Sequence, residues 1–473
     1  MSPRRTRQVL LLSLLLAPFL ARAAASRPNV LFIVADDMNK SLGAYGDPLA
    51  RSPNVDRLAA RAVRFDRAYC QYPVCSPSRV SFLSGVRPER TRMFGNEGSS
   101  RTPALKDAVF MPEYFRKHGY FTARVGKMFH IGRDVPECWD VTDEGTGLAK
   151  TLYQPAEIKE LGLEANVVAR QIPRIGNGEG NTWAMVDAAE EKLVDHRIAT
   201  RAVALIEQGV QSGKPFFVTC GFRRPHLPRF APSKYFEQFA AADLPLPPRP
   251  PAGALLPAAP ATSTDQEQRE ALRSYLACVA FMDAQLGRVL DAMDRGKLWD
   301  NTIVVFLGDH GYLTGSRGGW WGKNVLYDEA ASTTLLIAAP GASRGVACVR
   351  VVEFLDFYPT LTGLAGLPMP AGAEGRSIAP LLSNPAAPWD HAAFTMLARD
   401  GKPTALSVST ERYRLIENAD GTRELYDVQA DPREWTNLAA SAAHRPALER
   451  LQALTARHRE KYWNQPEAKA DPR

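Results

Sequence analysis

Four short apolar runs, each followed directly by charged or polar residues, constrain the fold of this chain more than any other feature. The runs cover residues 30–34, 120–125, 216–219 and 303–307. Near-continuous apolar runs of this length are typical of strands buried on both faces of a largely parallel sheet. Ligands of such sheets bind beyond the carboxyl ends of the strands. The sequence therefore predicts one site at that edge, built by the polar residues that follow the runs.

Amphipathic helices are predicted between these runs. Apolar residues recur at three- and four-residue steps over residues 266–295, and shorter helices are predicted over 54–63, 112–118 and 194–207. Strands that alternate with helices define an α/β fold. We therefore predict a large, mostly parallel central sheet flanked by helices, within a catalytic domain over residues 26–385.

Glycine and proline cluster near residues 370–395, which predicts a domain boundary there. Beyond it, short strands are predicted over 406–409, 413–417 and 425–428, and a helix is predicted over 443–461. Together they predict a smaller C-terminal α+β subdomain over residues 386–473, with a small antiparallel sheet and a terminal helix.

The first 25 residues are predicted to be a secretory signal peptide. Arg4, Arg5 and Arg7 precede an apolar run over residues 9–20, and Ala23–Ala25 offers small residues for cleavage. The run is too short to span a bilayer, so we expect export to the periplasm or the exterior without stable membrane insertion. Cleavage would remove four arginines and lower the formal net charge from +7 to +3, and we therefore expect no nucleic-acid partner.

The six cysteines, at positions 70, 75, 138, 220, 278 and 348, lie far apart in the chain. They show neither the density of a disulfide framework nor the spacing of a zinc site. Cys220 and Cys278 lie within apolar runs, and we predict that they are core residues.

Two adjacent carboxylates, Asp36 and Asp37, directly follow the first apolar run. Neighbouring acids repel each other unless a cation or a proton relieves the repulsion. With Asp309 and His310, which follow the fourth run, they would supply a mostly oxygen site for a hard divalent cation. The carboxylate-rich set favours Ca²⁺ over Zn²⁺, and a solvated loop is the alternative interpretation.

Cations gather at the ends of the other runs. Lys127 and His130 follow the second run, His226 follows the third, and Lys323 lies downstream of the fourth. Burying several cations without an anionic partner is costly, so the pattern indicates a small oxyanion or its ester. Sulfate and phosphate both satisfy this requirement.

The turn Cys75-Ser76-Pro77-Ser78-Arg79 precedes a helix-compatible run over residues 80–83. Such a turn at a helix N-terminus presents free backbone N–H groups and the positive end of the helix dipole, which favours an anion. The alternative interpretation is a buried cysteine beside a proline-containing turn.

These motifs resemble those of the type I sulfatases of the alkaline phosphatase superfamily, over nearly the whole chain after residue 25. The matching pieces are residues 29–37, 75–79, 126–127, 308–311 and 424–427. Within that family the chain is most similar to the iduronate-2-sulfatase branch, by residues 126–130, 222–228 and 321–328. The resemblance implies an alkaline phosphatase-like fold and a hydrolase of sulfated carbohydrates, with a 2-O-sulfated uronate as the candidate substrate.

The same resemblance implies a role for each candidate residue. Cys75 would be oxidised to formylglycine by a formylglycine-generating maturation enzyme, and one hydroxyl of the aldehyde hydrate would attack sulfur. Arg79 and Lys127 would stabilise the hydrate, and His226 and Lys323 would bind sulfate and assist departure of the sugar alcohol. His130 would take the proton of the second hydroxyl and so expel sulfate. Ca²⁺ would be held by Asp36, Asp37, Asp309, His310 and the modified Cys75.

Two alternatives remain at this point: a phosphoester hydrolase of the same superfamily, and a non-catalytic protein that binds sulfated glycans with Cys75 unmodified. Residues 313–319 depart from the human-like pattern, which has a Gly-Glu-His-Gly run there, so the identity of the sugar stays open. Trp320, Trp321 and Tyr327 would either stack on a sugar or pack in the interior.

Overall fold

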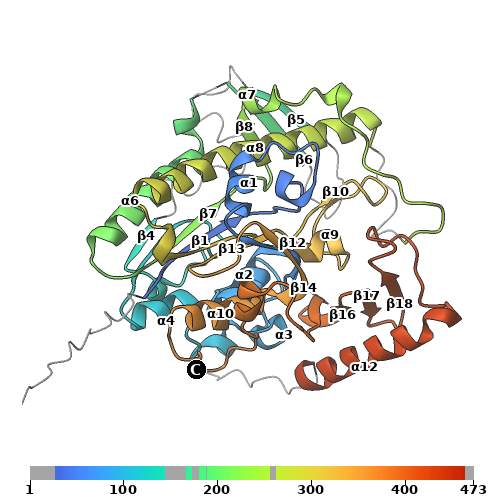
Figure 1. The fold of residues 1–473 in the computed structure, drawn as a ribbon. Helices are drawn as coiled ribbons and strands as arrows, with labels where there is room; N and C mark the ends of the chain where they lie inside the picture. The colour runs from blue at the N-terminus through green and yellow to red at the C-terminus, as the bar shows by residue number, and fades with distance from the viewer. Residues whose placement is uncertain (1–26, 144–166, 173–180, 188, 256–262, 464–473) are drawn as a thin grey trace, which may run out of the picture.

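The four strands predicted from the apolar runs lie side by side in the middle of one nine-stranded sheet (Figure 1). They are β1 (Asn29–Ala35), β3 (Phe121–Gly126), β7 (Phe216–Phe222) and β9 (Thr302–Gly308). Their order across the sheet is β9-β1-β7-β3, and each neighbouring pair is parallel. The predicted α/β class and mostly parallel central sheet are therefore confirmed.

The computed structural model describes residues 27–143, 167–172, 181–187, 189–255 and 263–463. The predicted signal peptide, with its cleavage site near Ala23–Ala25, lies outside these residues. Within them, no helix is long and apolar enough to cross a membrane.

The remaining strands extend the sheet on both sides of this parallel core. Strand β4 pairs parallel with β3, whereas β13 pairs antiparallel with β9 and with β2. Strand β2 in turn pairs antiparallel with β12 and parallel with β14. The bounds are β2 (Val63–Tyr69), β4 (Val141–Asp143), β12 (Ser332–Thr333), β13 (Leu335–Ala338) and β14 (Val346–Glu353).

Strand β1 is apolar from Val30 to Ala35 because helices cover both faces of the sheet. Leu31 and Ile33 pack into a core cluster with residues of α6 (Val194–Gln211) and α8 (Asp265–Arg295). Phe32 and Val34 pack into a second cluster with residues of α2 (Cys75–Ser84), α4 (Met111–Lys117) and α10 (Phe357–Leu364). Successive side chains of a strand point to opposite faces, which explains the alternation between the clusters. Figure 1 shows the sheet between these two helical layers.

The described helices agree with most of the predicted ones. They are α1 (Pro53–Ala59), α2 (Cys75–Ser84), α3 (Pro88–Thr91), α4 (Met111–Lys117), α6 (Val194–Gln211), α7 (Ser233–Phe236), α8 (Asp265–Arg295), α9 (Asp328–Ala331), α10 (Phe357–Leu364), α11 (Ala379–Ser383) and α12 (Arg445–Tyr462). The helix predicted over 54–63 was wrong at its end, since α1 stops at Ala59 and Val63 starts β2 by pairing with Ile337 and Val346.

Two smaller sheets, which the sequence analysis did not predict, lie near the end of the parallel strands. One has three strands, β5 (Val167–Ile172), β6 (Asn181–Val186) and β8 (Arg229–Pro232). The other is the short antiparallel pair β10 (Leu313–Thr314) and β11 (Trp321–Gly322). Strands β8 and β11 matter for function because they follow or precede candidate site residues.

A four-stranded antiparallel sheet with one helix forms the C-terminal part (Figure 1). Its strands are β15 (Ala393–Arg399), β16 (Lys402–Ser409), β17 (Tyr413–Asn418) and β18 (Arg423–Asp427). Leu451 of α12 packs against Val408, Leu415 and Leu425 of this sheet. The small C-terminal sheet is thus confirmed, with β15 as a strand that the sequence analysis missed.

A buried ionic cluster joins this C-terminal sheet to the central sheet. Glu353, at the end of β14, accepts hydrogen bonds from the Arg87 guanidinium at 2.8 and 2.6 Å and from the backbone N–H of Phe394 in β15 at 2.9 Å. The His391 Nε2 lies 3.5 Å from a Glu353 oxygen and 3.6 Å from an Asp356 oxygen. The contact between the two parts therefore depends on charge as well as on apolar packing.

We predict that this cluster makes stability depend on pH. Burial alone would lower the pKa of His391, but the carboxylates of Glu353 and Asp356 outweigh burial and raise it. A raised folded pKa contributes stability that is complete below the unfolded pKa of about 6.5 and is lost as pH rises through the folded value. The urea midpoint should therefore fall as the pH rises above about 6.5.

His391→Gln should show a smaller fall, because it lacks the titrating group. His444→Gln, at the N-cap of α12, is the matched control and should follow the wild type. Equal pH dependence in wild type and His391→Gln would contradict the prediction.

Candidate active site

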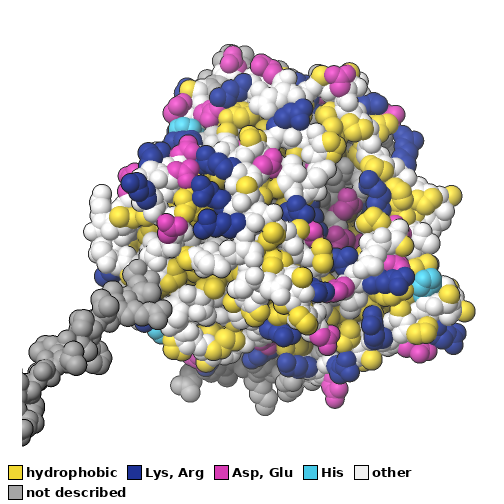
Figure 2. Space-filling view, viewed as in Figure 1, with side chains coloured by type: hydrophobic (Ala, Val, Ile, Leu, Met, Phe, Trp, Pro, Cys, Tyr) yellow, Lys and Arg dark blue, Asp and Glu magenta, His cyan; other side chains and the backbone are white. Residues whose placement is uncertain are grey.

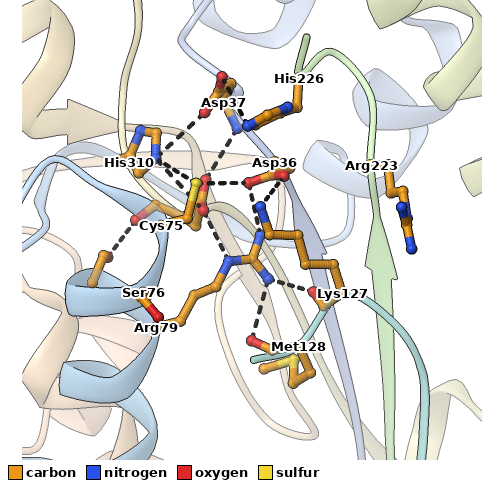
Figure 3. A network of polar contacts seen from close by, with 12 residues as sticks. Asp36, Asp37, Cys75, Ser76, Arg79, Lys127, Met128, Arg223, His226 and His310 are labelled. Atoms are coloured by element: carbon orange, nitrogen blue, oxygen red, sulfur yellow. Dashed lines mark hydrogen bonds and ion pairs between the residues drawn. The ribbon is translucent and has the colours of Figure 1, made fainter. Parts of the chain in front are cut away.

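The polar residues that follow the parallel strands meet at the carboxyl edge of the sheet, as predicted (Figure 3). Asp36 and Asp37 directly follow β1, and Asp309 and His310 follow β9. Lys127 follows β3, and His226 lies in the loop after β7. Cys75 and Arg79 lie in the first turns of α2, which begins at Cys75 itself.

Close approach of two strand ends explains the Gly126-Lys127 pair. Gly126 has a φ of 72°, and a Cβ there would lie 2.2 Å from the carbonyl oxygen of Gly221 in β7. A Cβ at Gly221 would likewise lie 2.1 Å from the carbonyl oxygen of Lys127. Only glycine fits at both positions, and their contact sets where the Lys127 side chain leaves the sheet.

Asp37 adopts a left-handed backbone conformation, with a φ of 60°. Its backbone N–H donates to Asp309 Oδ1 at 3.1 Å, and its carbonyl oxygen accepts from the Tyr275 hydroxyl of α8 at 2.8 Å. Aspartate tolerates this conformation better than most residues, but it still needs such support. These contacts turn the Asp37 carboxylate toward Cys75, His226 and His310 (Figure 3).

Arg79 bridges two of the carboxylates. Its Nε donates to Asp309 Oδ2 at 2.9 Å and its Nη2 to Asp36 Oδ1 at 3.2 Å. The Nη1 donates to the carbonyl oxygens of Lys127 and Met128. The guanidinium is fully buried, so it fixes the loops after β1, β3 and β9 relative to α2.

Two lysines complete a balanced set of charges. Lys127 Nζ lies 2.5 Å from Asp36 Oδ2, and Lys323 Nζ lies 2.5 Å from Asp37 Oδ1. With Arg79 they place three cations against the carboxylates of Asp36, Asp37 and Asp309. Arg79 and Lys127 are buried, whereas Figure 2 shows basic and acidic side chains interspersed on the molecular face in view.

The cations keep both aspartates of the Asp36-Asp37 pair ionised. Burial alone would raise the pKa of Asp36, but Lys127, His226, Arg79 and Lys323 together hold it well below its usual range. Burial also opposes ionisation of Asp37, and His226 and Lys323 outweigh it to lower the pKa of Asp37 to about 2.

Cys75 lies at the centre of this cluster and is fully buried. Its Sγ lies 3.4 Å from Asp36 Oδ1, 3.5 Å from His310 Nε2 and 3.1 Å from Lys323 Nζ. Burial, followed by the charge of Asp36, raises the pKa of the Cys75 thiol. Because only the thiolate is a strong nucleophile, the unmodified side chain is poorly suited to attack a substrate.

The donor set fits a hard divalent cation. Ligand atoms of Asp36, Cys75, Asp309 and His310 lie within 4.8 Å of one another, as do those of Asp36, Asp37, Cys75 and His226. His310 Nδ1 contacts the carbonyl oxygen of Gly311 at 2.8 Å, which assigns the proton to Nδ1 and leaves a lone pair on Nε2. That lone pair faces Asp37 Oδ1 at 3.4 Å and Asp309 Oδ2 at 3.6 Å, an arrangement that a bound cation would make favourable.

Two further histidines are held in their neutral form. Burial lowers the pKa of His226, against the opposing charge of Asp37, whose Oδ2 lies 3.9 Å from its Nε2. Burial and the charge of Lys127 lower the pKa of His130 to about 3. The Nδ1 of His130 is buried without a hydrogen-bond partner among the described residues, so this nitrogen can bond to a bound substrate or water.

The structure thus brings together nine of the ten candidate residues through direct contacts, and places His130 within the electrostatic influence of Lys127 and Asp36. Trp320, Trp321 and Tyr327 are 8%, 1% and 6% exposed, which favours packing over sugar stacking.

The sequence analysis missed two supporting residues, the Tyr275 hydroxyl and the Asp195 carboxylate. Asp195 accepts hydrogen bonds from the backbone N–H groups of Arg223 and Arg224, each at 2.9 Å. Asp195 lies in α6 and Tyr275 in α8, away from the strand ends on which the prediction of site residues was based.

Comparisons with known proteins place this geometry in a family. The model of the sulfatase family matches residues 28–367, and a model described as N-sulphoglucosamine sulphohydrolase, C-terminal, matches residues 316–461. A sulfatase of Formosa agariphila is 33% identical over 450 residues, which cover 90% of this chain and 86% of that protein. The iduronate 2-sulfatase of Homo sapiens is 32% identical over 409 residues, which cover 74% of this chain and 71% of that protein.

A solved structure shows the same fold. The phosphonate monoester hydrolase SpPMH from Silicibacter pomeroyi matches with a TM-score of 0.74 and 26% identity, over 92% of this chain and 96% of that one. By the family model and the two relatives, the chain belongs to the sulfatase family. It is an enzyme of that family, and its reaction is the hydrolysis of sulfate esters.

We predict that Gly126→Ala displaces Lys127 and lowers kcat/KM at least about tenfold, because a shift of about 1 Å in a site can cost about a hundredfold. Gly213→Ala is the matched control: its φ of 67° is close to the 72° of Gly126, but a Cβ there meets nothing within 4 Å. The control should lose about 1 kcal/mol of stability and keep its activity. Steady-state kinetics on both variants test this, and equal activity losses would contradict it.

Proposed function

We propose that this enzyme removes sulfate from a sulfated carbohydrate, with Cys75 converted to formylglycine as the nucleophile and Ca²⁺ as the cofactor. The observation that carries the proposal is the position of Cys75. Its side chain lies at the N-terminus of α2, in contact with Asp36, His310 and Lys323. An oxygen nucleophile there would lie beside the cation site and a helix N-terminus, where negative charge is stabilised.

The charge of the site supports an anionic substrate. Three carboxylates and three cations already balance without a metal. A divalent cation bound by Asp36, Asp37, Asp309 and His310 would leave an excess of two positive charges, which matches the charge of released sulfate. The bound ion would supply Lewis-acid polarisation of the sulfate oxygens.

The chain's own residues would then divide the work of the reaction. The hydrate of the Cys75 aldehyde would supply two geminal oxygens, one to attack sulfur and one to expel sulfate afterwards. Lys127 and Arg79 hold the Asp36 carboxylate beside residue 75 and offset the negative charge of that carboxylate. Lys323 and His226 would bind sulfate oxygens and assist departure of the alcohol. His130, neutral at pH 7, would accept the proton of the second hydroxyl.

The substrate proposal rests on the relatives. The Homo sapiens relative is an iduronate 2-sulfatase, and the motifs by which the sequence resembles that branch lie in the segments that carry Lys127, His226 and Lys323. We therefore propose a 2-O-sulfated uronate within a sulfated polysaccharide as the substrate. We also propose export after cleavage near Ala23–Ala25, and maturation by a formylglycine-generating enzyme.

Cys75→Ala should abolish turnover of 4-nitrophenyl sulfate by enzyme prepared with its maturation enzyme, because the variant has no oxygen nucleophile. Cys348→Ala is the matched control, since Cys348 is equally buried but lies in β14 at the far side of the sheet. It should keep the wild-type rate. Turnover by Cys75→Ala at the wild-type rate would refute the proposed nucleophile.

A phosphoester hydrolase is the second candidate, favoured by the structural match to a phosphonate monoester hydrolase. The same assay distinguishes the two when 4-nitrophenyl phosphate and a phenylphosphonate ester are run beside the sulfate. The proposal expects the highest kcat/KM with the sulfate ester. A higher value with either phosphorus ester would favour the second candidate.

Calcium should stabilise the folded protein as well as support activity. After treatment with EGTA, added Ca²⁺ should raise the thermal midpoint, since a ligand at about a hundred times its Kd adds about 2.7 kcal/mol of stability. Asp309→Asn should lose this response, whereas Asp291→Asn, an exposed acid of α8, should retain it. A response of Asp309→Asn equal to the wild type would place the ion elsewhere.

A further inference from the structure

Arg229, the first residue of β8, is a buried cation that has no carboxylate partner among the residues that the structure describes. Its side chain is 1% exposed, and no acidic side chain within the described part of the chain forms an ion pair with it. Its Nη1 donates to Ser274 Oγ at 3.4 Å, and its Nε has no hydrogen-bond partner among those residues. Burying a charge in this way is costly, so other contacts must compensate.

Three aromatic rings surround the Arg229 guanidinium, and we call them the aromatic cage. The Cζ of Arg229 lies 5.2 Å from the ring centroid of Tyr275, 5.4 Å from that of Tyr312 and 5.0 Å from that of Trp321. The faces of aromatic rings carry negative charge density and attract a cation at such distances, most strongly when water is excluded. The cage therefore takes the place of a carboxylate.

Two of the rings belong to segments that carry a site residue, and the third ring contacts such a segment. Tyr312 lies two residues after His310, and Trp321 lies two residues before Lys323. The Tyr275 hydroxyl donates to the carbonyl oxygen of Asp37 and accepts from the backbone N–H of Asn39 at 2.9 Å. Arg229 itself lies three residues after His226. One guanidinium thus contacts, through three rings, the segments that hold most of the site.

The rings have little freedom to move independently. Trp321 Nε1 donates to Gln268 Oε1 at 2.7 Å, and the rings of Tyr275 and Tyr312 stack with centroids 6.0 Å apart. The rings of the cage are thus held by contacts with Gln268 and with each other, as well as by the guanidinium at its centre.

We propose that Arg229 is a positioning residue. Through the aromatic cage, it holds the side chains of His226 and Lys323 in place beside those of Asp37 and His310. The proposal rests on the proposed function, in which His226 and Lys323 assist departure of the alcohol. Displacing both residues should slow esters with poor leaving groups more than esters with good ones, because a good leaving group needs little assistance. A merely structural role would lower the amount of folded enzyme and slow all esters equally.

The test compares kcat/KM for 4-nitrophenyl sulfate, a good leaving group, with that for phenyl sulfate, a poor one. Arg229→Met removes the charge and the planar group, and it should raise the ratio of the two values about tenfold. Arg229→Lys keeps the charge without the planar face, and it should raise the ratio less. The ratio does not depend on how much of a preparation is folded, so a partly unfolded variant still gives a result.

Arg61→Lys is the matched control, because Arg61 also lies over an aromatic ring, 4.9 Å from the centroid of Trp299. That pair precedes the start of β2 and β9, at the edge of the sheet opposite the site, and the variant should keep the wild-type ratio. A wild-type ratio in both Arg229 variants would overturn the positioning role. Failure of the wild type to hydrolyse either sulfate ester would instead overturn the proposed function.

Discussion

The buried bridge from Arg79 to Asp36 and Asp309 is the interaction on which the rest of the site depends. It joins the first turns of α2 to the ends of β1 and β9, and through the carbonyl oxygens of Lys127 and Met128 to the end of β3. Two carboxylates this close would repel each other without a cation. The guanidinium therefore holds the two carboxylates together while it fixes the N-terminus of α2, where Cys75 lies.

The parallel sheet and its site edge could be predicted from the sequence because burial on both faces demands continuous apolar strands. The run over 30–34 became β1, and its odd and even residues fill two separate cores, as the runs of its neighbours do. The small C-terminal sheet was predicted from its alternation and turns, although β15 was missed. The end of α1 was predicted too late because propensity does not reveal that Val63 pairs with β13 and β14.

The candidate site residues could be predicted because polar and charged residues of the expected types follow the strands. The residues that hold them in place could not be predicted in this way. Tyr275, Asp195 and Arg229 act on the site across distances of tens to hundreds of residues in sequence, through a hydroxyl, two backbone N–H groups and three aromatic faces. The pattern of α8 predicts a buried face for Tyr275, but not the carbonyl that its hydroxyl reaches. Such contacts depend on tertiary packing, and they determine whether the candidate site residues are correctly placed relative to one another.

The most direct test of the account is the mass of the tryptic peptide Ala68–Arg79 from enzyme purified out of its native host, measured beside the specific activity of the same preparation. The account predicts an aldehyde in place of the Cys75 thiol, in a fraction of molecules that rises and falls with activity. Full sulfatase activity in a preparation whose Cys75 is an intact thiol would contradict it.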